Sequence, residues 1–149
     1  MDRSRVQLVG FSGSQKEHLA MYRDIDIALD TFPYHGTTTT LDALLMGVPV
    51  VTLAGYNHAS RVGASLLGQV VIPELIARTG DEYVAKAIEL AGDPGRVAAL
   101  HGALRGKLLA STLCDGPGFA RKFEFALRGM LLNWCRSRGV ALSPAESAQ

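Results

Sequence analysis

A strand-like run, a threonine-rich turn, a helix-like run and a second strand-like run follow one another between residues 25 and 53. The two strand-like runs, residues 25–29 and 48–53, are apolar on both faces. Gly47, followed by Pro49, predicts the end of the helix between them, at about residues 38–46. Strands of this kind alternating with helices are typical of a parallel sheet with helices on both faces. The predicted fold class is therefore α/β, with a Rossmann-like parallel sheet flanked by helices.

Other segments extend this alternation along the chain. Residues 6–11 predict a short buried strand, and residues 14–17 have the capping-box pattern of a helix that runs to about residue 23. After residue 53 we expect a helix at 60–67 capped by Ser60 and a short helical turn at 74–77. The rest of the chain is expected to be helical, at residues 81–91, 94–109 and 117–135.

Apolar side chains recur every three or four residues in the last of these helices. This spacing predicts a stripe that faces a core. The residues of the stripe are Phe119, Phe123, Leu127, Met130, Leu131 and Trp134.

The length and composition fit one domain that can bury a core. The chain has 149 residues, of which 48% are hydrophobic. We expect a domain over residues 1–138 and a disordered tail over 139–149. No apolar stretch approaches the roughly 18 residues of a membrane span, and no signal-like segment opens the chain. These features predict a cytoplasmic protein without a membrane partner.

The distribution of cysteine, histidine and charge narrows the function classes. Cys114 and Cys135 are too few for a disulfide framework, and the four histidines form no metal-binding pattern, so no metal site is predicted. Residues 93–138 carry eight Lys or Arg against three Asp or Glu, within a net charge of +1. Few aromatic residues separate these basic residues, so solvated helix faces are expected and no nucleic-acid partner is.

The threonine-rich turn, residues 35–42, is the candidate binding site. If Thr37 is the N-cap, Thr38 and Thr39 lie in the first helical turn, where unpaired N–H groups and the helix dipole favour a phosphate or diphosphate. Asp42 shares their helical face, so its carboxylate can accept hydrogen bonds from a ribose. The alternative is an ordinary helix cap, with Asp42 only complementing the dipole.

The loops after the predicted strands also point to a ligand site. Residues 12–14, 33–37 and 54–58 follow three strands, and the carboxyl ends of parallel strands meet at one edge of a sheet. A nicotinamide-dependent oxidoreductase would need G-x-G-x-x-G after the first strand. Residues 10–13 supply only G-x-x-G, so that class does not fit.

Several blocks of the sequence resemble a known family. The main ones are residues 26–39 (DIALDTFPYHGTTT) and 42–53 (DALLMGVPVVTL), followed by 58–67 (HASRVGASLL) and 74–77 (ELIA). The order of later elements, with Tyr83 and the helices up to Trp134, extends the match over nearly the whole chain. The chain resembles the carboxyl-terminal catalytic region of the O-linked N-acetylglucosamine transferase family, which includes the plant Spindly relatives and bacterial homologues.

The resemblance implies a GT-B glycosyltransferase, in which two Rossmann-like domains face each other and the second binds the nucleotide-sugar donor. This chain resembles that second domain. The implied donor is UDP-N-acetylglucosamine, and the implied acceptors are Ser and Thr side chains of proteins. In the family, Thr38 and Thr39 would contact the diphosphate, Asp42 the ribose, and His18 with Gln15 the base. Thr37 is also counted among the donor-binding residues. Animal enzymes have a lysine at the Gln15 position and a histidine at the Thr37 position.

The resemblance also implies parts that this sequence lacks. The acceptor-binding first domain, an upstream lysine that contacts the diphosphate and a tetratricopeptide superhelix have no counterpart here. No catalytic residue is therefore assigned, and no cofactor is expected beyond the donor substrate. We expect a donor-binding half that is inactive alone. A relative that uses GDP-fucose or UDP-glucose, and a non-catalytic interaction module, stay open as alternatives.

Overall fold

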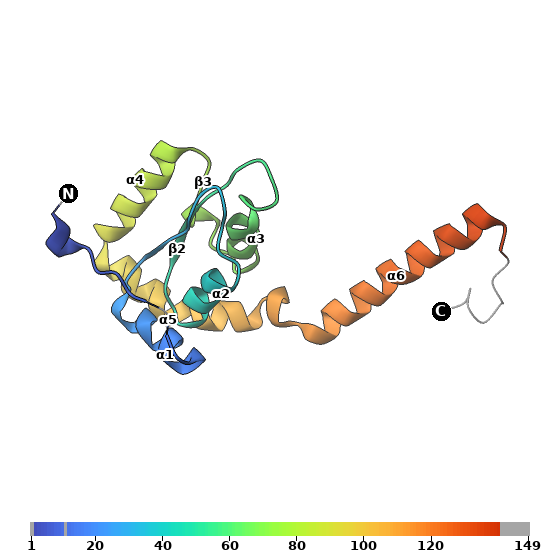
Figure 1. Cartoon of the computed structure of the whole chain (residues 1–149), viewed down its shortest axis with the longest axis horizontal. Helices are drawn as coiled ribbons and strands as arrows, with labels where there is room; N and C mark the ends of the chain where they lie inside the picture. The colour runs from blue at the N-terminus through green and yellow to red at the C-terminus, as the bar shows by residue number, and fades with distance from the viewer. Residues whose placement is uncertain (1, 11, 141–149) are drawn as a thin grey trace. The chain divides into compact units, whose positions relative to one another are not determined.

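The structure is a computed structural model that describes residues 2–10 and 12–140. The chain divides into two compact units, Met1–Ser111 and Thr112–Gln149. The first unit contains the sheet and most of the helices (Figure 1). Its elements in chain order are η1 (Arg3–Arg5), α1 (Gln15–Met21), η2 (Tyr22–Asp24), β1 (Ala28–Leu29), α2 (Thr38–Leu45), β2 (Val50–Leu53), α3 (Val62–Gln69), η3 (Pro73–Leu75), β3 (Ile76–Ala77), α4 (Gly80–Ala91) and α5 (Pro94–Ala110).

The three strands form a parallel sheet in the order β1-β2-β3. Ala28 pairs with Val50, and Thr52 pairs with Ile76, so β2 is the central strand. Helices α3 and α4 both pack against β2, and α5 packs against α2 and α4. The α/β fold class with a helix-flanked parallel sheet is confirmed. The short strand β3 was not expected, because residues 74–77 were predicted as a helical turn alone.

Local sequence signals set the ends of α1 and α2. The Ser14 hydroxyl accepts the Glu17 N–H at 3.2 Å, and the Glu17 carboxylate reaches back to the Gly13 N–H at 3.0 Å. At the end of α2, Gly47 has φ +86°, and the N–H groups of Gly47 and Val48 donate to the Leu44 and Ala43 carbonyls. This Schellman arrangement needs the left-handed conformation that glycine adopts most easily. Both predicted signals are confirmed.

The core lies between the sheet and its helices. Aliphatic side chains from α2, β2, α3, α4 and α5 fill it, and none of the largest is exposed by more than 2%. The largest buried apolar side chains are Leu44, Val48, Val50, Val51, Leu67, Val70, Ile72, Leu75, Leu90 and Leu104. Helix α2 enters this core through Ala43 and Leu44, and Thr38 and Thr39 at its start are exposed.

The prediction of a strand at residues 6–11 is wrong for the described residues 6–10. Residues 6–10 form no regular structure, and Val6, Leu8 and Val9 are exposed; Phe11 lies outside the described residues. A strand needs a ladder of hydrogen bonds as well as apolar side chains. In the described chain β1 pairs only with β2 and is an edge of the sheet. An apolar run alone therefore did not establish the strand.

The second unit contains η4 (Thr112–Cys114) and α6 (Gly116–Arg138). The apolar stripe of α6 was expected to face a core, but all six of its side chains are exposed, from 49% at Leu127 to 68% at Met130. The helical spacing gathers these side chains on one face but does not provide a surface that covers them. Gly139 caps the helix in the left-handed conformation. The predicted tail lies, from residue 141 onward, outside the described residues.

Helix α3 begins at Val62 and is not capped by Ser60 as predicted. Ser60 instead exchanges hydrogen bonds with Asn57, with its hydroxyl 2.9 Å from the Asn57 Oδ1.

Across residues 2–10 and 12–140, no helix has both the length and the apolar character needed to cross a bilayer.

Candidate functional site

A pocket of about 740 Å³ lies where α1, the start of α2 and the segment before α1 meet. Its volume is within the range of roughly 300–1,000 Å³ that is common for small-molecule sites. The lining residues are Val9, Gly10, Ser12, Gly13, Ser14, Gln15, His18, Met21, Thr38, Thr39 and Asp42. Five predicted donor-binding residues are therefore brought together, and the sixth, Thr37, is the N-cap residue directly before α2.

The start of α2 contributes hydrogen-bond donors to this pocket. Thr37 is the N-cap as expected, and its carbonyl accepts the Leu41 N–H at 3.0 Å. This is the first hydrogen bond of the helix, so the N–H groups of the residues before Leu41 lie outside its internal hydrogen-bond ladder. Within the described residues the Thr37 hydroxyl makes no capping hydrogen bond. The ordinary-cap alternative predicts such a hydrogen bond, which the Thr37 hydroxyl does not make, and the exposed residues Thr38 and Thr39 line the pocket.

Helix α1 also lines the pocket, through Gln15, His18 and Met21. His18 Nε2 lies 3.3 Å from Asp42 Oδ2, which joins the two helices at the residues predicted to hold the base and the ribose. The His18 ring also meets the Tyr22 ring edge to face, with centroids 5.5 Å apart. A ligand hydroxyl that approached Asp42 would meet a carboxylate that is already oriented by an imidazole.

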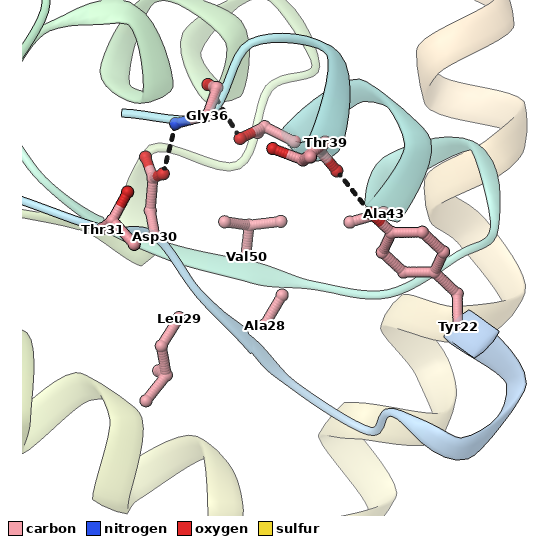
Figure 2. Close-up of a pocket in the computed structure, with 10 residues that line it drawn as sticks. Tyr22, Ala28, Leu29, Asp30, Thr31, Gly36, Thr39, Ala43 and Val50 are labelled. Carbon is pink, nitrogen blue, oxygen red and sulfur yellow. Dashed lines mark hydrogen bonds between the residues drawn. The ribbon is translucent and has the colours of Figure 1, made fainter. Parts of the chain in front are cut away.

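Tyr22 was missed by the sequence reasoning. Its hydroxyl donates to the Thr39 carbonyl at 3.1 Å, so it ties the end of α1 to the first turn of α2 (Figure 2). Burial, and after it the nearby Asp42 carboxylate, raises the pKa of the Tyr22 hydroxyl above its ordinary value. The hydroxyl therefore keeps its proton and remains a donor to the turn.

A second cavity lies behind the turn. It has a volume of about 140 Å³ and is lined by residues of β1, by Gly36 and by the buried side of α2. Figure 2 shows the Asp30 carboxylate under Gly36, whose N–H donates to Asp30 Oδ1 at 2.9 Å. This contact fixes the chain directly before the threonines.

His35 lies in the turn between β1 and α2, and the sequence shows no partner near it. Its partners are distant: Nε2 lies 2.9 Å from the Leu53 carbonyl, 18 residues away, and Nδ1 lies 3.0 Å from the Gly63 nitrogen, 28 residues away. Its position in the turn between β1 and α2 was the available signal. Local spacing could not reveal contacts that depend on the packing of β2 and α3.

The three loops expected at one edge of the sheet line three different pockets, and Gly36 of the loop 33–37 lines the cavity of about 140 Å³. Residues 12–14 line the pocket of about 740 Å³ with the start of α2. The loop after β2 instead lines a separate pocket of about 830 Å³, which contains Arg61 and Arg78. Within residues 2–10 and 12–140, no group of three His, Cys, Asp or Glu side chains is placed to hold a metal ion.

Comparisons with known proteins agree on one family. Residues 1–123 match the model of glycosyl transferase family 41. A barley (Hordeum vulgare) protein named a probable UDP-N-acetylglucosamine–peptide N-acetylglucosaminyltransferase SPINDLY is 43% identical over 98% of this chain and 16% of its own length. A Caenorhabditis elegans UDP-N-acetylglucosamine–peptide N-acetylglucosaminyltransferase is 33% identical over 87% of this chain and 11% of its own.

A solved structure supports the same assignment. A mutant O-GlcNAc transferase from Thermobaculum terrenum superposes with a TM-score of 0.78 at 43% identity, over 84% of this chain and 24% of that chain. The chain thus spans less than a quarter of the length of these relatives. On the family match over 123 of 149 residues and these identities, the chain belongs to glycosyl transferase family 41.

Proposed function

We propose that this chain is the donor-binding part of a GT-B glycosyltransferase that uses UDP-N-acetylglucosamine to modify Ser or Thr side chains of proteins. The observation that carries the proposal is the pocket that Gln15 and His18 of α1 line together with Thr38, Thr39 and Asp42 of α2. The names of the barley and nematode relatives support the same donor and a peptide acceptor.

The proposed chemistry is recognition and charge stabilisation. N–H groups at the start of α2, with the hydroxyls of Thr38 and Thr39, would bind the diphosphate, since a helix N-terminus favours an anion. Asp42 would accept hydrogen bonds from the ribose, and His18 with Gln15 would border the base. As the sugar leaves, the same donors would stabilise the charge that develops on the diphosphate.

The remaining parts of the reaction belong to the rest of a longer protein. The chain corresponds to 16% of the barley relative, so groups that bind the protein acceptor are expected beyond it. We therefore propose that the chain binds nucleotide but needs a second Rossmann-like domain to transfer sugar. The protein acceptor and tetratricopeptide repeats are proposed partners of the whole protein.

Calorimetric titration with UDP, GDP and NAD tests the proposal. We expect UDP to bind and NAD not to bind. The Asp42→Ala substitution should weaken UDP binding about 5- to 150-fold, because losing a hydrogen bond to a charged group costs about 1–3 kcal/mol. Asp81→Ala, which removes an exposed carboxylate from the first turn of α4, is the matched control and should leave affinity unchanged.

The other outcomes of the titration would contradict different parts of the proposal. Tighter binding of GDP than UDP would favour a relative with a GDP-sugar donor. Absence of nucleotide binding at millimolar concentrations would favour a non-catalytic interaction module. Equal UDP affinity in the parent and Asp42→Ala would remove Asp42 from the site.

A further inference from the structure

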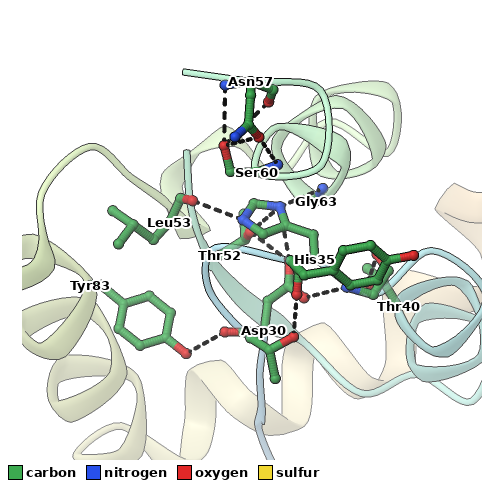
Figure 3. Close-up of polar contacts among 12 residues, drawn as sticks. Asp30, His35, Thr40, Thr52, Leu53, Asn57, Ser60, Gly63 and Tyr83 are labelled. Carbon is green, nitrogen blue, oxygen red and sulfur yellow. Dashed lines mark hydrogen bonds and ion pairs between the residues drawn. The ribbon is translucent and has the colours of Figure 1, made fainter. Parts of the chain in front are cut away.

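A buried polar cluster lies behind the threonine-rich turn, at the carboxyl ends of β1 and β2. Asp30 and Thr52 come from these strand ends, His35 from the turn and Gly63 from the first turn of α3 (Figure 3). The His35 side chain has no exposed surface, and that of Asp30 is 3% exposed. Buried polar side chains are tolerated only when hydrogen bonds replace those to water. The hydrogen-bond partners in the cluster therefore limit where its hydrogens can lie.

The partners of His35 determine where its ring proton lies. The Gly63 N–H donates to Nδ1 at 3.0 Å, so Nδ1 must carry a free electron pair. Nε2 lies 2.9 Å from the Leu53 carbonyl, an acceptor, so Nε2 must carry the hydrogen. Asp30 Oδ2, 3.4 Å from Nδ1, instead receives the Thr52 hydroxyl hydrogen at 2.7 Å. The arrangement thus requires the neutral Nε2–H tautomer.

The cluster also fixes the backbone that leads into α2. Asp30 Oδ1 accepts the Gly36 N–H at 2.9 Å, and the His35 N–H donates to the Ala59 carbonyl at 3.0 Å. The Gly36 carbonyl in turn accepts the Thr40 hydroxyl at 3.0 Å. Thr38 and Thr39 therefore lie between two anchored points, Gly36 and Thr40. Any shift of His35 would be passed directly to the start of α2.

An imidazole is well suited to this position. It presents one donor and one acceptor at a fixed separation, so a single rigid ring can join a strand carbonyl to a helix N–H. A carboxylate offers only acceptors, and an ammonium offers only donors. The ring thus ties the end of β2 to the first turn of α3 and holds both against the turn.

We propose that His35 is a positioning residue for the donor diphosphate. In its neutral Nε2–H form it joins Leu53 to Gly63 and holds Gly36, Thr38 and Thr39 in the geometry that presents their donors to the pocket. This inference rests on the proposed nucleotide-binding function of the same pocket. His35 itself makes no contact with the ligand, since its side chain is fully buried.

The test compares UDP affinity in three variants by calorimetry. His35→Ala removes both ring contacts and should weaken UDP binding at least about tenfold, through loss of positioning. His35→Asn keeps an acceptor near the Nδ1 position and should recover part of this loss. His101→Ala is the matched control: it removes a ring that bonds the Asp26 carbonyl at 3.0 Å before β1, and should leave UDP affinity unchanged.

Urea titrations separate positioning from a purely structural role. If His35→Asn is folded and less stable but binds UDP as tightly as the parent, the inference is overturned. Should His35→Ala fail to fold, the comparison of His35→Asn with His101→Ala decides it. If the parent itself binds no UDP, the proposed function and the inference both fail. If the parent binds UDP and the His35 variants bind it equally tightly, only the inference fails.

Nitrogen-15 NMR of the parent gives a second readout. At neutral pH, the His35 Nε2 resonance should be that of a protonated ring nitrogen, and the Nδ1 resonance that of an unprotonated one. A ring protonated at Nδ1 would overturn the proposed arrangement, because the Gly63 N–H would then lose its acceptor.

Discussion

Gly63 offers the sharpest test of the buried cluster. A Cβ at this position would lie too close to Asp30 Oδ2 and Thr52 Oγ1, and 3.0 Å from His35 Nδ1. These three atoms belong to one hydrogen-bonded group, in which Thr52 donates to Asp30 at 2.7 Å. A Gly63→Ala substitution must therefore push α3 away or break the cluster.

The expected loss of stability follows from two effects. Overpacking a well-packed site costs about 1–3 kcal/mol. A buried polar group left without its partner costs about another 1–3 kcal/mol. Gly63→Ala should thus lower the free energy of unfolding by roughly 2–6 kcal/mol.

Gly68 is a control in the same helix. Nothing lies within 4 Å of a Cβ built there, so Gly68→Ala should raise the free energy of unfolding by about 0.5–1 kcal/mol through better helix propensity. Urea titrations followed by circular dichroism measure both variants. The two substitutions should change the midpoint in opposite directions. A Gly63→Ala variant as stable as Gly68→Ala would refute the close packing of α3 on the cluster.

Two further predictions concern the backbone and the alkaline limit of stability. Gly47→Ala should cost at least about 1–2 kcal/mol in a urea titration, because φ is +86° and the His101 carbonyl lies 2.7 Å from a built Cβ; unchanged stability would contradict the Schellman end of α2. Burial raises the pKa of Tyr22 and Tyr83, with Asp42 and Asp30 adding second, so the folded chain holds both protons more tightly than the unfolded chain. Their contribution is complete below about pH 10 and is lost as pH rises through the folded-state values. The Tyr22→Phe, Tyr83→Phe double variant should lose less stability than the parent in urea titrations above that pH, and an identical loss would contradict the shift.

The sequence predicted best those features that depend on neighbouring residues. The start of α2 at Thr38 and its end before Gly47 follow from capping and backbone rules that act over four or five residues. The grouping of Thr38, Thr39 and Asp42 on one helical face follows from the helical period alone. For this reason the wall that α2 contributes to the pocket could be described before the structure was known.

Features that depend on a distant partner were not predictable in this way. The apolar run at residues 6–10 has strand-like composition, but no strand of the described chain pairs with it. The stripe on α6 has helical spacing, yet Phe119 and Trp134 are exposed. The hydrogen bonds of the His35 ring form only when β2 and α3 pack around it. Periodicity reports the shape of an element and not the surface that it meets.

The proposed function depends on nucleotide binding in the pocket that α1 and α2 line. An NMR titration of the labelled chain with UDP locates such binding residue by residue, because each backbone amide reports its own surroundings. We expect the largest shifts at Gln15, His18, Thr38, Thr39 and Asp42, which line this pocket. Saturable shifts confined to the separate pocket that contains Arg61 and Arg78, or no shifts at millimolar UDP, would contradict it.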